Sequence, residues 1–306
     1  MDLHALTDAL GTHLPAVMRW AGGVARRMRG FNIALTGKHS GSAATDALTL
    51  ADLTVQELLI GALRDCDPIF RHCRIEAEET TGDLARFADD GDYTLALDPI
   101  DGTKQYRDKT GNGYSIILTL RSPESLHYTL VYAPESGPFG SWVEVSGQRL
   151  ICGYDDPSRT AREILSGMTP ITPETHRGSK KIYLIGFQEH DRAKAELVTQ
   201  TGLEGVAADD CPGCLYELLA TGEFGGSLIH SPNVYDFPAS LHIARVLGGD
   251  ALWVHNGQPV NFHMLWNDDR ASMLRLPGIV ATSPSPKVLK TLIHLARDWN
   301  PVRYAE

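Results

Sequence analysis

The segment TLALDPIDGT at residues 94–103 constrains the fold more than any other part of the chain. Its short apolar run is typical of a strand and ends on Asp98, and Asp101 follows three residues later across a proline. Two carboxylates this close together repel each other unless a positive group lies nearby. The sequence therefore predicts either a bound cation at the end of this strand or a turn that is exposed to solvent.

The residues that follow the aspartates can bind an anion. Gly102 lets the backbone approach a ligand closely, and Thr103 supplies a hydroxyl and an amide. If a helix begins near Thr103, its free N–H groups favour negative charge. Carboxylates suit Mg²⁺, which proteins commonly hold through one or two carboxylates, waters and a substrate phosphate. The segment therefore favours a site for Mg²⁺ and phosphate together.

A single pair of carboxylates makes a poor two-metal site, so we expect further acids elsewhere. Glu78 and Glu79 end a strand-like run in EAEET, Asp236 precedes a helix, and Asp52 lies inside an amphipathic helix. Each has an ordinary structural explanation: a solvated turn for the glutamates, a helix N-cap for Asp236 and an exposed helix position for Asp52. Only their combination points to a metal site.

The rest of the chain alternates helical and strand-like patterns, which favours a layered α/β or α+β architecture. Helical spacing is found over residues 3–29 and 48–64, and strand patterns over residues 70–76, 93–98, 114–121, 127–133 and 141–151. Residues 152–180 are rich in Pro, Ser, Thr and Gly and are followed by a strand (KIYLIGF), three helices (RAKAELVTQTG, LYELLATG, FPASLHIARVLGG) and a strand (ALWVH). We therefore expect two halves, residues 1–152 and 153–306.

Composition limits the partners of the chain. Its 306 residues carry a formal net charge of -10, which argues against a nucleic-acid polymer or an anionic membrane as the main partner. A small phosphorylated ligand stays compatible because a metal ion inverts the local field. The sequence lacks an apolar run long enough for a transmembrane helix and a signal-peptide pattern, and its five cysteines are scattered. We therefore expect a cytoplasmic protein.

The ordered motifs EAEET, DPIDGT and VYDFPASLHIARVLGG, with LTLAD upstream, resemble those of the Mg²⁺-dependent, lithium-sensitive inositol monophosphatase superfamily. DPIDGT matches without departure, whereas Tyr235 replaces the usual tryptophan. The resemblance spans roughly residues 46 to 260. It implies an α/β (α+β) layered αβαβα sandwich of the sugar-phosphatase type, a small phosphate monoester as substrate and a homodimer.

The resemblance also implies a role for each matching position. The ligands of two or three Mg²⁺ ions would be Glu78, Asp98, the carbonyl of Ile100, Asp101 and Asp236. The attacking water would be oriented and activated by Asp52 and Thr103, with Glu79 next to the bridging Glu78. The amides of Gly102 and Thr103 would hold the phosphate. A phosphate monoester carries about two negative charges at pH 7, so a nucleophile needs this neutralisation to approach it.

The residues after DGT bear on the substrate. Lys104, Gln105 and Tyr106 resemble the branch that acts on 3′-phosphoadenosine 5′-phosphate, although Lys104 can equally be a surface lysine. His230 and Asn233 precede Asp236 and either touch the leaving group or belong to a loop. Inositol 1-phosphate, another sugar or polyol phosphate, and histidinol phosphate stay open as alternatives.

Two segments allow other interpretations. Lys38 lies in the loop TGKHSGSAATDA, which either closes over the metals when substrate binds or is an inert flexible linker. Cys211 and Cys214 form a CxxC motif that would suit a zinc or thiol-redox protein, but the sequence holds no second CxxC. A non-catalytic protein that keeps the fold is the third class, which a test of Mg²⁺-dependent phosphate release separates from an enzyme.

Overall fold

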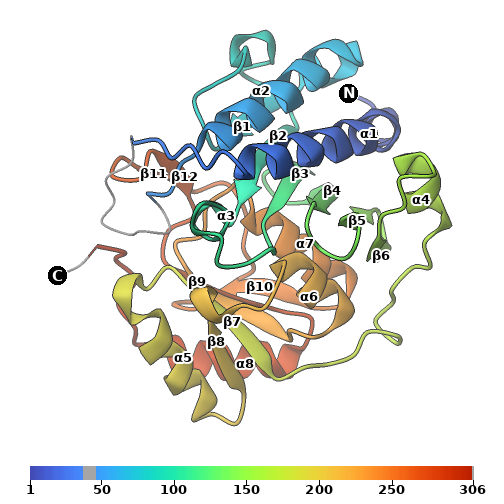
Figure 1. Cartoon of the computed structure of the whole chain (residues 1–306). Coiled ribbons are helices and arrows are strands. Elements are labelled where there is room, and N and C mark those ends of the chain that lie inside the picture. The colour runs from blue at the N-terminus through green and yellow to red at the C-terminus, as the bar shows by residue number, and fades with distance from the viewer. Residues whose placement is uncertain (37–45, 305–306) are drawn as a thin grey trace.

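The computed structural model describes residues 1–36 and 46–304, and Lys38 therefore lies outside the described residues. Two sheets are stacked with helices between and outside them (Figure 1). The order of layers is α1 and α2, the first sheet, α6 and α7, the second sheet, and α5 with α8. These five layers confirm the predicted αβαβα sandwich.

The first sheet has six strands in chain order: β1 (Arg74–Ala77), β2 (Thr94–Asp101), β3 (Ser115–Arg121), β4 (Leu126–Ala133), β5 (Ser141–Ser146) and β6 (Arg149–Tyr154). β1 is parallel to β2, and the other neighbours are antiparallel. Leu118 of β3 belongs to the core cluster that includes residues of α1 (Leu3–Arg29) and α2 (Leu50–Asp65), whereas Ile117 belongs to the cluster that includes residues of α6 (Leu215–Thr221) and α7 (Phe237–Val246). Because both faces are covered, every residue of β3 is buried.

The second sheet has five strands in the order β10-β13-β9-β7-β8, and a separate pair forms a small two-stranded sheet. Its strands are β7 (Lys181–Ile185), β8 (Glu204–Ala207), β9 (Gly226–His230), β10 (Asp250–Trp253) and β13 (Ile279–Ser283), and the small sheet is β11 (Trp266–Asp268) with β12 (Met273–Arg275). The outer face packs against α5 (Asp191–Thr199) and α8 (Pro286–Ala296). The inner face receives Phe237 and Leu241 of α7, which join the two sheets through one helix layer.

Short helices complete the described chain: η1 (Pro68–His72), η2 (Leu84–Arg86), α3 (Thr103–Asp108), α4 (Ala161–Gly167), η3 (Gln188–His190) and η4 (Ala208–Asp210). The strand expected over residues 70–76 is wrong in its first half, which belongs to η1. Asp67 accepts a hydrogen bond from the Ile69 amide and Pro68 occupies the first turn, so local capping overrides the apolar pattern there.

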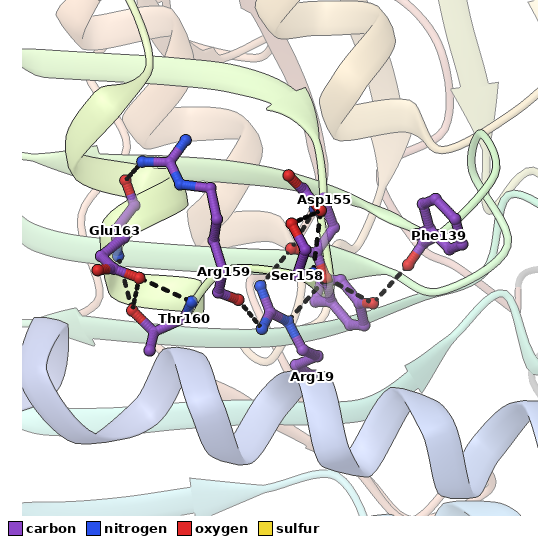
Figure 2. Close-up of polar contacts among 9 residues, drawn as sticks. Arg19, Phe139, Asp155, Ser158, Arg159, Thr160 and Glu163 are labelled. Atoms are coloured by element: carbon purple, nitrogen blue, oxygen red, sulfur yellow. Dashed lines mark hydrogen bonds and ion pairs between the residues drawn. The ribbon is translucent and has the colours of Figure 1, made fainter.

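A polar network fastens the outer helix layer to the segment after β6 (Figure 2). Arg19 of α1 donates through Nε and Nη2 to the two carboxylate oxygens of Asp155, at 2.8 and 2.5 Å, and through Nη1 to the Arg159 carbonyl at 2.8 Å. Thr160 and Glu163 form the capping box that starts α4. The network lies where the sequence suggested a boundary, and the division at residues 152 and 153 stays a prediction.

Candidate active site

A cleft of about 480 Å³ collects side chains from both halves of the chain. Its wall includes the end of β2, the start of α3, the ends of β7 and β9, the start of α7 and part of the C-terminal segment. Its volume falls within the range of small-molecule sites. Of the predicted site residues, the cleft wall contains Glu78, Asp98, Ile100, Asp101, Gly102, Thr103, Lys104, His230, Asn233 and Asp236.

Three aspartates meet in this cleft. Asp98, Asp101 and Asp236 each offer a carboxylate oxygen, and these oxygens lie within 4.8 Å of one another. Burial raises the pKa of Asp98 well above its usual range, and the charges of Glu78, Asp101 and Asp236 raise it further. The pKa values of Asp101 and Asp236 are raised in the same way, with burial as the largest cause. The cluster is therefore a repelling group of oxygen donors in which Asp98 is buried and Asp101 and Asp236 are half-buried.

The backbone of β2 explains how two of these carboxylates face one cleft. The pairing of β2 with β3 shifts register between Asp98 and Asp101, so the strand bends there instead of continuing its alternation. The Asp98 side chain accepts a hydrogen bond from the Ile100 amide at 3.0 Å, which fixes this bend. Gly102 follows with a φ of 84°, a left-handed conformation that suits glycine, and α3 starts at the next residue.

Asp52 and Thr103 are in contact, although 51 positions separate them in the chain. The Thr103 hydroxyl lies 3.0 Å from Asp52 Oδ1 and 2.7 Å from the Ile100 carbonyl oxygen. The other oxygen of Asp52 accepts from the amide and hydroxyl of Thr49 at 2.8 and 2.6 Å. Burial is the main reason that the pKa of Asp52 is raised to about 6. Asp52 is fully buried rather than an exposed helix residue, and it also caps α2.

Gln56 has a positioning role that the sequence did not reveal. It lies one helical turn after Asp52, donates to the carbonyls of Glu79 and Thr81 at 2.6 and 2.7 Å, and accepts from the Glu79 amide at 3.0 Å. These bonds fix the EAEET turn after β1, which places Glu78 in the cleft wall and Glu79, itself buried, behind it. The spacing of four residues from Asp52 on one helix face is the signal that could have found Gln56.

The predicted substrate contacts already have protein partners. Lys104 Nζ donates to Asp209 of η4 at 2.8 Å. The ring nitrogens of His230 lie 3.0 Å from Ser231 Oγ and 3.1 Å from the Asn300 carbonyl, and burial lowers the pKa of this imidazole to about 4. Asn233 Oδ1 accepts from the Asp236 amide at 3.0 Å, which holds the start of α7.

The CxxC cysteines show no sign of redox or zinc chemistry. Both are free thiols, and Cys211 Sγ donates to the Gly213 carbonyl at 3.4 Å. Burial raises the pKa of Cys211 to about 11, which leaves it protonated and weakly nucleophilic. Within residues 1–36 and 46–304, the group of acids or metal-binding side chains arranged for a metal is the aspartate cluster.

A five-layer sandwich with a carboxylate cluster in its cleft has the ligand chemistry of a metal site. A family model described as the inositol monophosphatase family matches residues 14–298. The chain therefore belongs to the inositol monophosphatase family, whose members are phosphoric monoester hydrolases. A search of curated proteins finds no match.

Solved structures of low sequence identity share the fold. The extragenic suppressor protein suhB from Bartonella henselae is 13% identical, with 97% of this chain and 100% of that chain covered and a TM-score of 0.63. CysQ from Bacteroides thetaiotaomicron is 18% identical, with 93% and 100% covered and a TM-score of 0.61. An IMPase/NADP phosphatase complexed with NADP and Ca²⁺ is 14% identical, with 98% of each chain covered and a TM-score of 0.65.

Within the described residues, every helix is too short or too polar to cross a membrane.

Proposed function

We propose that this protein is a Mg²⁺-dependent phosphomonoesterase that hydrolyses a small phosphorylated metabolite with water as the nucleophile. The observation that carries the proposal is the convergence of Asp98, Asp101 and Asp236 in one cleft. Their oxygens have the chemistry that Mg²⁺ prefers. The largest charge effects on Asp98 come from other carboxylates, so a bound cation would relieve a repulsion that the fold itself maintains.

The oxygen ligands of the cluster fit Mg²⁺ in type. Glu78, the three aspartates and the Ile100 carbonyl would hold two or three Mg²⁺ ions, as the family resemblance implies. When bound, Mg²⁺ would neutralise the phosphate charge and lower the pKa of the attacking water. The cleft-lining residues Gly102 and Thr103 would offer backbone amides to the phosphate oxygens.

Asp52 and Thr103 would handle the proton of the attacking water. The Thr103 hydroxyl would accept a hydrogen bond from the water and pass a proton to Asp52 Oδ1, which lies 3.0 Å away. A pKa of about 6 makes Asp52 a stronger base than an ordinary aspartate while keeping it mostly ionised at neutral pH. Thr49 holds the other oxygen of Asp52, so the acceptor keeps one orientation.

Within this reaction class, we propose 3′-phosphoadenosine 5′-phosphate as the leading substrate. The support is the motif DGTKQY, whose Lys104 and Gln105 both line the cleft. The ion pair of Lys104 with Asp209 is partly exposed, so a substrate phosphate can replace it at small cost. Lithium sensitivity, a homodimer and a cytoplasmic location are proposed on the family resemblance.

A substrate panel tests the proposal. Initial rates of phosphate release are measured with 3′-phosphoadenosine 5′-phosphate, inositol 1-phosphate, fructose 1,6-bisphosphate and histidinol phosphate, with Mg²⁺ and with or without Li⁺. We expect Mg²⁺-dependent, Li⁺-inhibited release, fastest from the bisphosphate nucleotide. Faster release from inositol 1-phosphate would correct the substrate, and release from none of the four would contradict the proposed reaction.

A further inference from the structure

Arg303 places a buried guanidinium in the cleft wall without a carboxylate partner. Its side chain comes from the segment after α8, is 8% exposed, and donates through Nη1 to the carbonyls of Gly186 and His230. Among the described residues, none of its nitrogens forms an ion pair with an acid. Its Nε is buried and has no hydrogen-bond partner in that part of the chain. A buried cation left in this state is costly unless a ligand supplies the missing charge.

The other arginines of the same cleft differ from Arg303. Arg275 pairs with buried Asp268 at 2.8 Å and donates to the Ser231 carbonyl, so its charge is compensated within the protein. Arg192 is exposed and pairs with Asp210 at 2.8 Å. Arg303 is therefore the arginine of this described cleft wall that forms no direct ion pair with an acid, because Asp268, which is paired with Arg275, and the Tyr304 side chain compensate its charge only in part.

Gln188 adds a second unsatisfied donor to the same part of the wall. Its Nε2 is buried without a partner among the described residues, and the residue lines the cleft. Its φ of 58° is strained for a non-glycine residue, and cleft-lining Ser231 has a φ of 49°. Gln188 lies two residues after Gly186, and Ser231 follows His230, so the strained residues flank the carbonyls that hold Arg303. The fold maintains strain where the unsatisfied donors lie.

We propose that Arg303 and Gln188 bind a second anionic group on the substrate, such as a phosphate, sulfate or carboxylate. Both unsatisfied atoms are hydrogen-bond donors, so the missing partner is an acceptor, and the positive charge of Arg303 selects an anionic one. Arg303 and Gln188 line the same cleft of about 480 Å³ as the carboxylate cluster, and a single metabolite can span that volume. The inference rests on the proposed function and assigns to these two residues the choice of a doubly anionic substrate over a monophosphate.

Matched ligand pairs test the inference. 3′-Phosphoadenosine 5′-phosphate is compared with adenosine 3′-phosphate, and fructose 1,6-bisphosphate with fructose 1-phosphate. Binding is titrated calorimetrically with Ca²⁺ in place of Mg²⁺, after a check that no phosphate is released, and kcat/KM is measured separately with Mg²⁺. We expect the wild-type protein to prefer the doubly anionic member of at least one pair by about ten- to a hundred-fold, the effect of one charged hydrogen-bonded contact.

Two variants and one control test whether Arg303 and Gln188 cause that preference. Arg303→Gln removes the charge, and Gln188→Glu replaces a donor with a negative charge at nearly constant shape. Both should abolish the preference in binding while affinity for the monophosphate stays within about threefold, whereas Arg192→Gln should keep the preference. If Arg303→Gln does not fold, Gln188→Glu decides alone.

The binding measurement tests the anion site, and the rate measurement tests the proposed reaction, so each claim can be contradicted without the other. Equal binding of both members of each pair to the wild-type protein, or an unchanged preference in Gln188→Glu, would overturn the inference. Absence of phosphate release with Mg²⁺, alongside an Arg303-dependent binding preference, would overturn the proposed reaction and leave this anion site standing.

Discussion

Two parts of the cleft wall carry uncompensated charge of opposite sign. Asp98, Asp101 and Asp236 crowd negative oxygens together, whereas Arg303 presents a guanidinium without an acid. Arg275 of the same cleft is different, because it forms an ion pair with buried Asp268. Negative and positive groups without an ion pair therefore lie in one cleft, where a cation and an anionic ligand can supply the missing charges.

Removing a charge from the aspartate cluster of the cleft wall should have the largest effect on turnover. Asp98→Asn removes one of the three clustered carboxylate charges, and we expect kcat to fall by at least about a thousandfold, because electrostatic stabilisation is usually the largest single contribution to catalysis. The measurement is the initial rate of phosphate release at saturating Mg²⁺ on the best substrate. Asp298→Asn, at an exposed position before the C-terminal segment, is the matched control and should keep normal turnover. An Asp98→Asn variant within tenfold of wild type would show that the cluster is not the catalytic metal site.

Breaking the proton acceptor behind the cluster should cost somewhat less. Asp52→Asn leaves the carboxylate cluster intact but removes the base that Thr103 contacts, so kcat should fall by about a hundred- to ten-thousandfold. Metal affinity, followed by calorimetric titration, should change little. Thr49→Ser keeps the capping hydroxyl and serves as the control. A loss of metal binding equal to the loss of turnover would contradict the separate role of Asp52.

Repulsion within the aspartate cluster should also lower the thermal stability of the metal-free protein. Asp101→Asn relieves repulsion in the cluster, so the melting temperature in EDTA should rise by about 2–8 °C, which corresponds to roughly 1–2 kcal/mol in a chain of this size. Mg²⁺ should stabilise the wild-type protein more than the variant, because it binds the folded state through the same carboxylates. A lower melting temperature of the variant in EDTA would show that the charge of Asp101 is compensated within the protein.

His242, a buried residue outside the cleft wall, should make the free energy of unfolding depend on pH. Burial, with smaller contributions from nearby His127 and Arg245, lowers the pKa of His242 to about 3, so the folded state keeps this imidazole neutral. Between pH 6.5 and 3 the unfolded state binds the extra proton, and the free energy of unfolding therefore falls as pH falls. His242→Gln, which retains a polar partner for Thr129, should flatten the slope between pH 6.5 and 5 by up to about 1.4 kcal/mol per pH unit. Urea denaturation at several pH values measures this, and equal slopes in both proteins would refute it.

The smallest effect should come from Lys104. Its partly exposed ion pair with Asp209 contributes little to stability, so Lys104→Ala should leave the melting temperature nearly unchanged. If its amine contacts a substrate phosphate, KM should rise about three- to tenfold with kcat unchanged, the pattern of a contact made equally in ground and transition states. Steady-state kinetics on the bisphosphate nucleotide provide the test, and identical KM values would make Lys104 a surface lysine.

The sequence predicted the clustered aspartates of the cleft far better than Arg303 and Gln188. Asp98 and Asp101 end an apolar strand within one short motif, which predicted that their carboxylates lie near each other, and the register shift between β2 and β3 lets both face the cleft. Asp236 and Asp52 came from matching motifs, and the fold brings Asp236 into the cluster and Asp52 into contact with Thr103.

Arg303 and Gln188 belong to no local sequence motif that predicts a binding site. Arg303 reaches the His230 carbonyl across 73 positions, and only tertiary packing of the C-terminal segment creates that contact. Gln188 becomes notable through its positive φ and unsatisfied amide, which side-chain type cannot reveal. The error at residues 70–73 had a similar origin, because capping by Asp67 outweighed the apolar pattern.

Calorimetric titration with Mg²⁺, with and without inorganic phosphate, tests the central claim most directly. The claim is that the repelling carboxylates exist to hold cations that in turn hold phosphate. The account predicts that the wild-type protein binds Mg²⁺, that phosphate strengthens this binding, and that Asp98→Asn weakens it at least about tenfold. Equal Mg²⁺ affinity in the two proteins, or no binding by the wild type, would contradict it.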